Sequence, residues 1–125
     1  TVQEAMISCV STPGQHAAVA ALTGPQDAVD AARLHYLANL EAASALLTER
    51  GMGHLVPGGA FYLWSAGSHA SGGDVAAWAE RFRREQRVAV APGSAFGASG
   101  EGWIRVCAAS TRADLLHGLA LLPAP

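Results

Sequence analysis

The chain has 125 residues, half of which are hydrophobic, and its formal net charge is -2. This length and composition suit one globular domain with a real core and exclude a disordered chain. All eight basic residues are arginines, and they give no basic excess of the kind that marks a nucleic-acid-binding protein. No apolar run approaches the roughly 18 residues that a membrane-spanning helix needs. We therefore expect neither a nucleic-acid nor a membrane partner.

The amino-terminal part of the chain is predicted to be helical. In residues 1–24, two short helical pieces, "VQEAMISCV" and "QHAAVAAL", are separated by the turn signal "STPG". Helical pieces with so many apolar residues would normally pack on a partner. Residues 25–50 follow, with Pro25 near the start, Gly51 just past the end, and apolar residues at three-to-four spacing between them. They predict one helix of about 25 residues, near 38 Å at 1.5 Å per residue, which is long enough to bridge two bodies.

Short strands and two more helices are predicted after Gly51. The composition of "SAGSHASGG" predicts a flexible loop, and Thr111 and Asp114 have the spacing of a capping box. The element order predicts an α+β two-layer sandwich, in which a small three-to-four-stranded sheet carries helices on one face and follows the long helix. The predicted strands are 59–64, 88–92 and 102–109, the predicted helices are 74–86 and 110–122, and the predicted loop is 65–73.

Metal and thiol chemistry find little support in the spacing of the side chains. The five histidines, at positions 16, 35, 54, 69 and 117, lack metal-ligand spacing, and we expect no metal site. Cys9 and Cys107 both lie in apolar contexts, which favours buried free thiols over a disulfide. Reduced cysteines, and the absence of a visible signal peptide in residues 1–14, favour a cytoplasmic location.

Two local patterns invite a ligand-binding interpretation. The cluster "RFRREQR" (81–87) is predicted to be a solvated helix face, with an anion or partner site as the alternative. The glycine-rich "PGSAFGASGEG" (92–102) resembles a phosphate loop, but a strand follows it where such a loop needs a helix, and the loop lysine is missing. A structural turn is therefore the favoured interpretation.

Arg105 is the most informative candidate in the sequence "GEGWIRVCAAST" (100–111). Strand alternation places Arg105 on the same face as Trp103 and Cys107, opposite two aliphatic neighbours. A guanidinium stays charged and carries five donors, so it needs an anion when it is removed from water. Two partners are open at this point: an internal carboxylate, for instance Glu101 or Asp114, or the carboxylate of a ligand held in bidentate fashion.

A family resemblance bears on this choice. The segments "STPGQHAAVAAL", "PGGAFYLW" and "VAVAPGSAFGASGEGWIRVCAAST", with the final leucine-rich helix, resemble the carboxyl-terminal third of the class I/II aminotransferases. These are fold-type I enzymes that use pyridoxal 5'-phosphate and transfer an amino group between an amino acid and a 2-oxo acid. The resemblance implies that Arg105 binds the substrate α-carboxylate. Phe61 matches a strand near the substrate entrance, with a core aromatic as an equal alternative.

The same resemblance implies roles for several other residues. Gly93 and Gly97 match a turn between two strands of the small domain, where they serve backbone geometry. Ser11 and Thr12 match a stretch that, in the dimeric family, approaches the active site of the neighbouring subunit. A homodimer is therefore expected.

The resemblance also implies a domain organisation. Residues 1–24 correspond to a remnant of the large cofactor domain, residues 25–50 to the connector helix, and residues 51–125 to the small domain. The partner of this chain is then the large domain that it lacks.

No lysine occurs in the chain, whereas the family holds its cofactor on a lysine. The resemblance therefore implies that the isolated chain has no catalytic or cofactor-binding residue, binds no pyridoxal 5'-phosphate and is inactive. The alternatives are a free-standing, non-catalytic α+β domain that binds amino acids or a protein partner, and a structural fragment whose Arg105 is internally paired.

Overall fold

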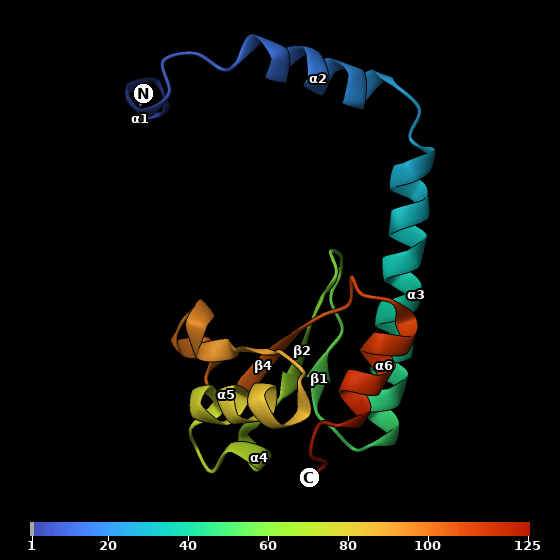
Figure 1. Cartoon of the computed structure of the whole chain (residues 1–125), viewed down its shortest axis with the longest axis vertical. Coiled ribbons are helices and arrows are strands. Elements are labelled where there is room, and N and C mark those ends of the chain that lie inside the picture. The colour runs from blue at the N-terminus through green and yellow to red at the C-terminus, as the bar shows by residue number, and fades with distance from the viewer. Residues whose placement is uncertain (1) are drawn as a thin grey trace. The chain divides into compact units, whose positions relative to one another are not determined.

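The computed structural model describes residues 2–125, which form six α-helices, two short 3-10 helices and one four-stranded sheet (Figure 1). Contacts between Cα atoms divide the chain into two units, one ending at Ala32 and a second formed by Arg33–Pro125. The boundary falls inside one continuous helix, α3 (Asp27–Glu49). The division into residues 1–24, 25–50 and 51–125 stays a prediction.

The first unit contains α1 (Val2–Met6), α2 (Thr12–Thr23) and the first turns of α3. None of residues 2–23 is buried. The predicted turn "STPG" is wrong, because α2 already begins at Thr12 and carries Pro13 in its first turn. A proline is tolerated there, since the first amides of a helix have no intrahelical acceptor.

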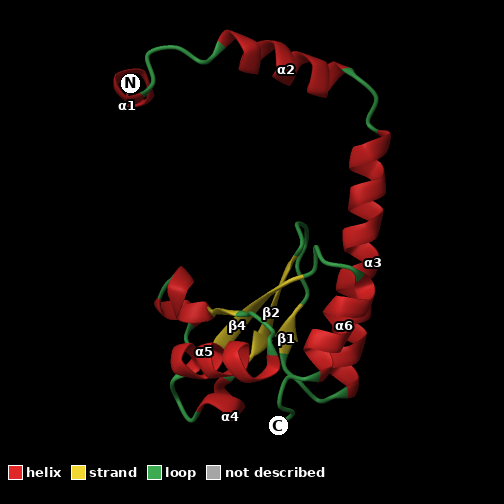
Figure 2. Ribbon diagram, in the orientation of Figure 1, coloured by secondary structure: helices red, strands yellow, loops and turns green. Residues whose placement is uncertain are grey.

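The second unit contains the sheet, in the strand order β1-β2-β4-β3 with every neighbouring pair antiparallel (Figure 2). Each predicted strand exists but is shorter than expected, and the two-residue strand β1 was not predicted. Ala60 has a positive φ of 61° after two glycines, so the chain enters β2 only at the next residues. The strands are β1 (His54–Leu55), β2 (Tyr62–Ala66), β3 (Ala91–Pro92) and β4 (Trp103–Cys107).

Side-chain caps fix the starts of the two helices that follow β2 and β4. At α5 (Val75–Gln86), the Asp74 carboxylate accepts a hydrogen bond of 2.9 Å from the backbone amide of Ala77. At α6 (Arg112–Ala120), the Thr111 hydroxyl accepts one of 3.2 Å from the amide of Asp114, as the capping-box spacing predicted. The segment predicted as a loop contains one helical turn, α4 (Ser68–Ser71).

The core lies on one face of the sheet. Leu63 on β2, and Ile104 and Val106 on β4, point to this face and are buried. Buried side chains from α3, α5 and α6 pack with them, which confirms the α+β two-layer sandwich with helices on one face. The helix residues of this core are Leu40, Ala43, Leu47, Val75, Trp78, Ala79, Phe82, Leu115 and Leu119.

The two cysteines are free but exposed, so the prediction that they are buried is wrong. Cys107 ends β4 on the face opposite Val106, and its thiol therefore does not reach the core. Cys9 lies in residues 2–23, which have no buried position. An apolar sequence context did not imply burial at either residue.

Candidate functional site

The candidate site lies on the face of the sheet opposite the core, which we call the outer face. Alternation along β2 and β4 places Tyr62, Trp64, Trp103 and Arg105 on this face, and all four are half-buried. In the sheet register, Arg105 lies opposite Trp64 of β2 on one side and opposite Ala91 of β3 on the other. It therefore occupies an inner strand of the sheet, where its backbone is held on both sides.

A glycine-dependent turn brings Phe96 onto the outer face. Phe96 ends the 3-10 helix η1 (Gly93–Phe96), which follows β3 directly. A Cβ atom at Gly93 would lie 2.1 Å from the carbonyl oxygen of Gly100 and 2.8 Å from both the Trp103 carbonyl oxygen and the Trp64 ring. The backbone can cross this closely only where glycine is present, so "PGSAFG" acts as a structural turn.

The Arg105 guanidinium lies over two aromatic rings. Its Cζ atom is 4.0 Å from the centroid of the Tyr62 ring and 4.0 Å from the centroid of the Phe96 ring. Within residues 2–125, no ion pair or hydrogen bond joins its side chain to another residue, so the internal pairs with Glu101 and Asp114 are not formed. The Asp114 carboxylate instead accepts a hydrogen bond of 2.7 Å from the Thr111 hydroxyl.

A shallow hollow of about 330 Å³ opens beside the guanidinium. Its walls are small or apolar apart from the Arg105 side chain, the Tyr62 ring and the Cys107 thiol. This arrangement offers one fixed positive charge in an otherwise apolar surrounding, which suits a ligand that carries one carboxylate. The lining residues are Tyr62, Ala89, Val90, Ala91, Arg105 and Cys107.

Phe61 lies next to Tyr62 in the chain and is not among the residues that line this hollow. Its half-buried ring packs against Tyr62, with centroids 4.7 Å apart, and against Tyr36 of α3, with centroids 5.1 Å apart. Its carbonyl oxygen accepts a hydrogen bond of 2.8 Å from the amide of Ala108. The ring thus joins the sheet to α3, and its role at a substrate entrance stays a prediction.

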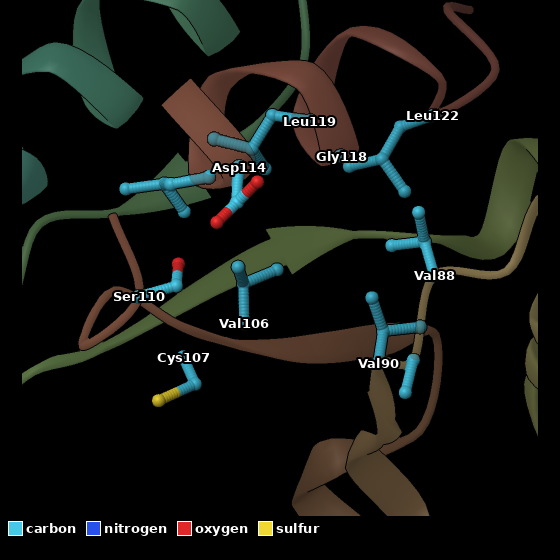
Figure 3. A pocket seen from close by; sticks show the side chains of 11 residues that line it. Val88, Val90, Val106, Cys107, Ser110, Asp114, Gly118, Leu119 and Leu122 are labelled. Atoms are coloured by element: carbon cyan, nitrogen blue, oxygen red, sulfur yellow. The ribbon is translucent and has the colours of Figure 1, made fainter. Parts of the chain in front are cut away.

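A second cavity, of about 260 Å³, lies between the segment 88–90 and α6 (Figure 3). Val88 and Val90 form one wall, Leu119 and Leu122 come from the helical side, and most of the remaining lining is aliphatic. The Asp114 carboxylate on its rim is already bonded to Thr111. The cavity therefore offers no unpaired charge comparable to that of Arg105.

Ser11 and Thr12 belong to the first unit of the chain. Ser11 occupies the N-cap position of α2 without a side-chain capping hydrogen bond, and Thr12 is the first residue of that helix. Their approach to a neighbouring subunit stays a prediction. Among residues 2–125, no group of three or more histidine, cysteine, aspartate or glutamate side chains is placed to hold a metal ion. The same residues contain no helix that is both long and apolar enough to cross a membrane.

The sequence interpretation missed the contribution of Tyr62 and Phe96. The signal for Tyr62 was available, since "GAFYLW" and "GWIRVC" are adjacent strands whose alternation places Tyr62 and Arg105 on one face. The signal for Phe96 was not, because its position depends on the fold of a glycine-rich turn. The aromatic pair around Arg105 is therefore a finding of the structure.

Comparison with known proteins gives the family. Residues 1–122 match the family described as "Aminotransferase class I and II", and the chain belongs to that family. It is 33% identical over 92 residues to an LL-diaminopimelate aminotransferase of Desulforudis audaxviator, covering 74% of this chain and 23% of the relative. It is 35% identical over 101 residues to an aspartate aminotransferase of Pyrococcus abyssi, covering 79% of this chain and 26% of the relative.

Solved structures agree with the fold. The aromatic aminotransferase of Pyrococcus horikoshii OT3 superposes with a TM-score of 0.82 at 32% identity, over 95% of this chain and 32% of that one. The aspartate aminotransferase of Thermotoga maritima gives a TM-score of 0.79 at 29% identity, over 95% and 29%. The chain thus spans about a quarter to a third of the length of these relatives.

Proposed function

We propose that this chain is the carboxyl-terminal portion of a pyridoxal-phosphate-dependent aminotransferase, and that Arg105 binds the α-carboxylate of its substrates. The reaction transfers an amino group between an amino acid and a 2-oxo acid. Membership of the family supports the reaction class. The observation that carries the role of Arg105 is a half-buried guanidinium that has two aromatic neighbours and no carboxylate partner among residues 2–125.

The geometry of a guanidinium explains how Arg105 would act. Its planar fork donates two parallel hydrogen bonds to one carboxylate, which fixes both the position and the orientation of the ligand. In a complete enzyme, this contact would hold the α-carbon of the substrate in register with the reacting groups and favour closure around it. We propose that Phe61, which packs against the Tyr62 ring, lies near the substrate entrance.

The residues of this chain do not fit the covalent attachment of pyridoxal 5'-phosphate. That attachment uses the ε-amino group of a lysine, and the chain contains none. We therefore propose that the cofactor is held by a large domain outside these 125 residues, and that the isolated chain binds no cofactor and is inactive. We further propose that the complete enzyme is a cytoplasmic homodimer.

The experiment that tests the proposal replaces Arg105 in the longer polypeptide that contains this segment. We expect Arg105→Lys to lower kcat/KM for amino-acid substrates about ten- to more than a hundredfold, because an ammonium cannot reproduce the bidentate contact and one charge-assisted hydrogen bond contributes about 1.5–3 kcal/mol. Cofactor binding, followed by absorbance, should be unchanged.

A matched control separates this effect from the general consequences of replacing an arginine with a lysine. Arg81→Lys changes an exposed arginine on α5 and should leave kcat/KM unchanged. If Arg105→Lys lowered only the melting temperature and left kcat/KM intact, Arg105 would be a structural residue and the assignment would be wrong.

A further inference from the structure

The two rings next to Arg105 leave the N–H donors of its guanidinium available to a ligand. Both ring centroids lie 4.0 Å from Cζ, within the range in which an aromatic face attracts a cation. The N–H donors of a guanidinium lie in its plane, and none of those of Arg105 is hydrogen-bonded to another residue within 2–125. The rings therefore attract the cation while its donors stay available to a ligand.

The rings are themselves held in place. The Phe96 ring meets the Trp64 ring edge to face, with centroids 5.7 Å apart and planes at 78°. The Tyr62 ring packs on Phe61, whose ring packs on Tyr36 of α3. Each neighbour of Arg105 thus belongs to an aromatic contact that does not depend on Arg105.

Different elements supply the two rings. Tyr62 belongs to β2, which pairs directly with β4, the strand of Arg105. Phe96 belongs to η1, whose backbone is fixed by the close crossing of Gly93 and Gly100. Because both elements are anchored by backbone contacts, neither ring needs a ligand to reach its position.

We propose that Tyr62 and Phe96 are positioning residues that hold Arg105 in its carboxylate-binding orientation before the substrate arrives; this inference rests on the function proposed above for Arg105. An arginine side chain that is free in solution must give up rotamer freedom when it binds a carboxylate. An arginine already held by contacts with two rings gives up less rotamer freedom, and the smaller entropic cost strengthens binding.

The orientation can be tested on the 125-residue chain without any substrate. Aromatic rings that face a guanidinium at this distance shift its Nε and Cδ proton resonances upfield, which NMR detects directly. We expect strong upfield shifts for Arg105, a partial loss of those shifts in Phe96→Leu, and their retention in Phe96→Tyr. Arg105 shifts in the wild-type chain equal to those of an unstructured arginine would overturn the proposal.

The consequence for binding is tested in the longer polypeptide. A positioning role affects substrate and transition state equally, so Phe96→Leu and Tyr62→Leu should each raise KM for amino acids about two- to tenfold and leave kcat nearly unchanged. Phe96→Tyr keeps the ring and should restore the wild-type KM. Tyr62→Phe should do the same, because the ring and not the hydroxyl is the proposed contact.

Arg105→Gln separates failure of this inference from failure of the proposed function. If Arg105→Gln abolishes productive binding while both leucine variants, shown by circular dichroism to be folded, keep the wild-type KM, the positioning role is wrong and the carboxylate role stands. If Arg105→Gln has no effect on KM or kcat, the proposed function itself fails. Phe96 is 48% exposed, so Phe96→Leu is expected to fold.

Discussion

The two faces of the sheet are built from the same strands, but they differ in burial and in the kinds of side chain that they carry. On the inner face, which is the face that carries the core, Leu63 and Ile104 are each 1% exposed beneath side chains from three helices. On the outer face, their chain neighbours Tyr62, Trp64 and Arg105 are half-buried. The Phe96 ring contacts two of them, Trp64 and Arg105. Because side chains alternate along a strand, one short stretch of sequence supplies both buried core residues and the exposed face that carries Arg105.

The two faces also differ in how well they tolerate the charge of Arg105. Burying Arg105 on the inner face would place a guanidinium among aliphatic side chains with no partner, at a high desolvation cost. On the outer face, the rings of Tyr62 and Phe96 contact the cation while its donors stay in reach of water or a ligand. The face without the helical core is therefore the one on which a binding arginine can be placed.

The largest effect that separates the faces is expected for Leu63→Ala. Truncating a fully buried leucine removes apolar contacts and leaves a cavity, so the free energy of unfolding should fall by about 2–5 kcal/mol. Leu55→Ala is the matched control, because Leu55 is also in a strand but is 55% exposed. Urea denaturation followed by circular dichroism measures both, and equal losses would contradict the assignment of the two faces.

A somewhat smaller effect is expected for Gly93→Ala, which disturbs the turn that supports the outer face. The new Cβ would meet two backbone carbonyl oxygens at 2.1 and 2.8 Å, which cannot move aside as a side chain can. We expect a loss of about 1–3 kcal/mol, typical of overpacking. Gly58→Ala has open space around the Cβ and is the control. If both variants unfolded at the same urea concentration, the inference that the close crossing of Gly93 and Gly100 requires glycine would be wrong.

Much of the difference between the two faces was predictable from the sequence. The alternation in "GWIRVC" placed Arg105 opposite Ile104 and Val106, and the structure confirms it. Caps and amphipathic spacing located α5 and α6 to within a few residues, because these signals are local. Local signals were sufficient wherever the structure depends on neighbours in the chain.

The missed features depend on contacts between residues far apart in the chain. Strand β1 has two residues and forms only because β2 offers it a partner, so no alternation could reveal it. Phe96 reaches Arg105 through the crossing at Gly93, which is a tertiary contact. The candidate site was therefore predictable in Arg105, and alternation carried a signal for Tyr62, but nothing local could place Phe96.

The smallest effect is expected from the charges on α5, whose apolar side packs on the inner face. Hydrogen bonds from the side chains of Arg83 and Arg84 hold the pKa of Glu80 at about 2, well below its ordinary value of 4.5. Because this pKa is lower in the folded chain than in the unfolded one, the unfolded chain binds more protons between these pH values. The contribution of Glu80 to stability is therefore present above pH 4.5 and is lost as the pH falls from 4.5 toward 2.

Glu80→Gln should remove that pH-dependent contribution and nothing else. We expect a small loss of stability at pH 7, because the pair is exposed to solvent and screened by salt. The difference between the variant and the wild type should shrink as the pH falls below 4.5. Glu85→Gln alters a glutamate on the same helix that has no ion pair in residues 2–125, and should give no such trend. If Glu80→Gln destabilised the chain as much as Leu63→Ala at pH 7, surface charge and not inner-face burial would dominate the stability of this domain.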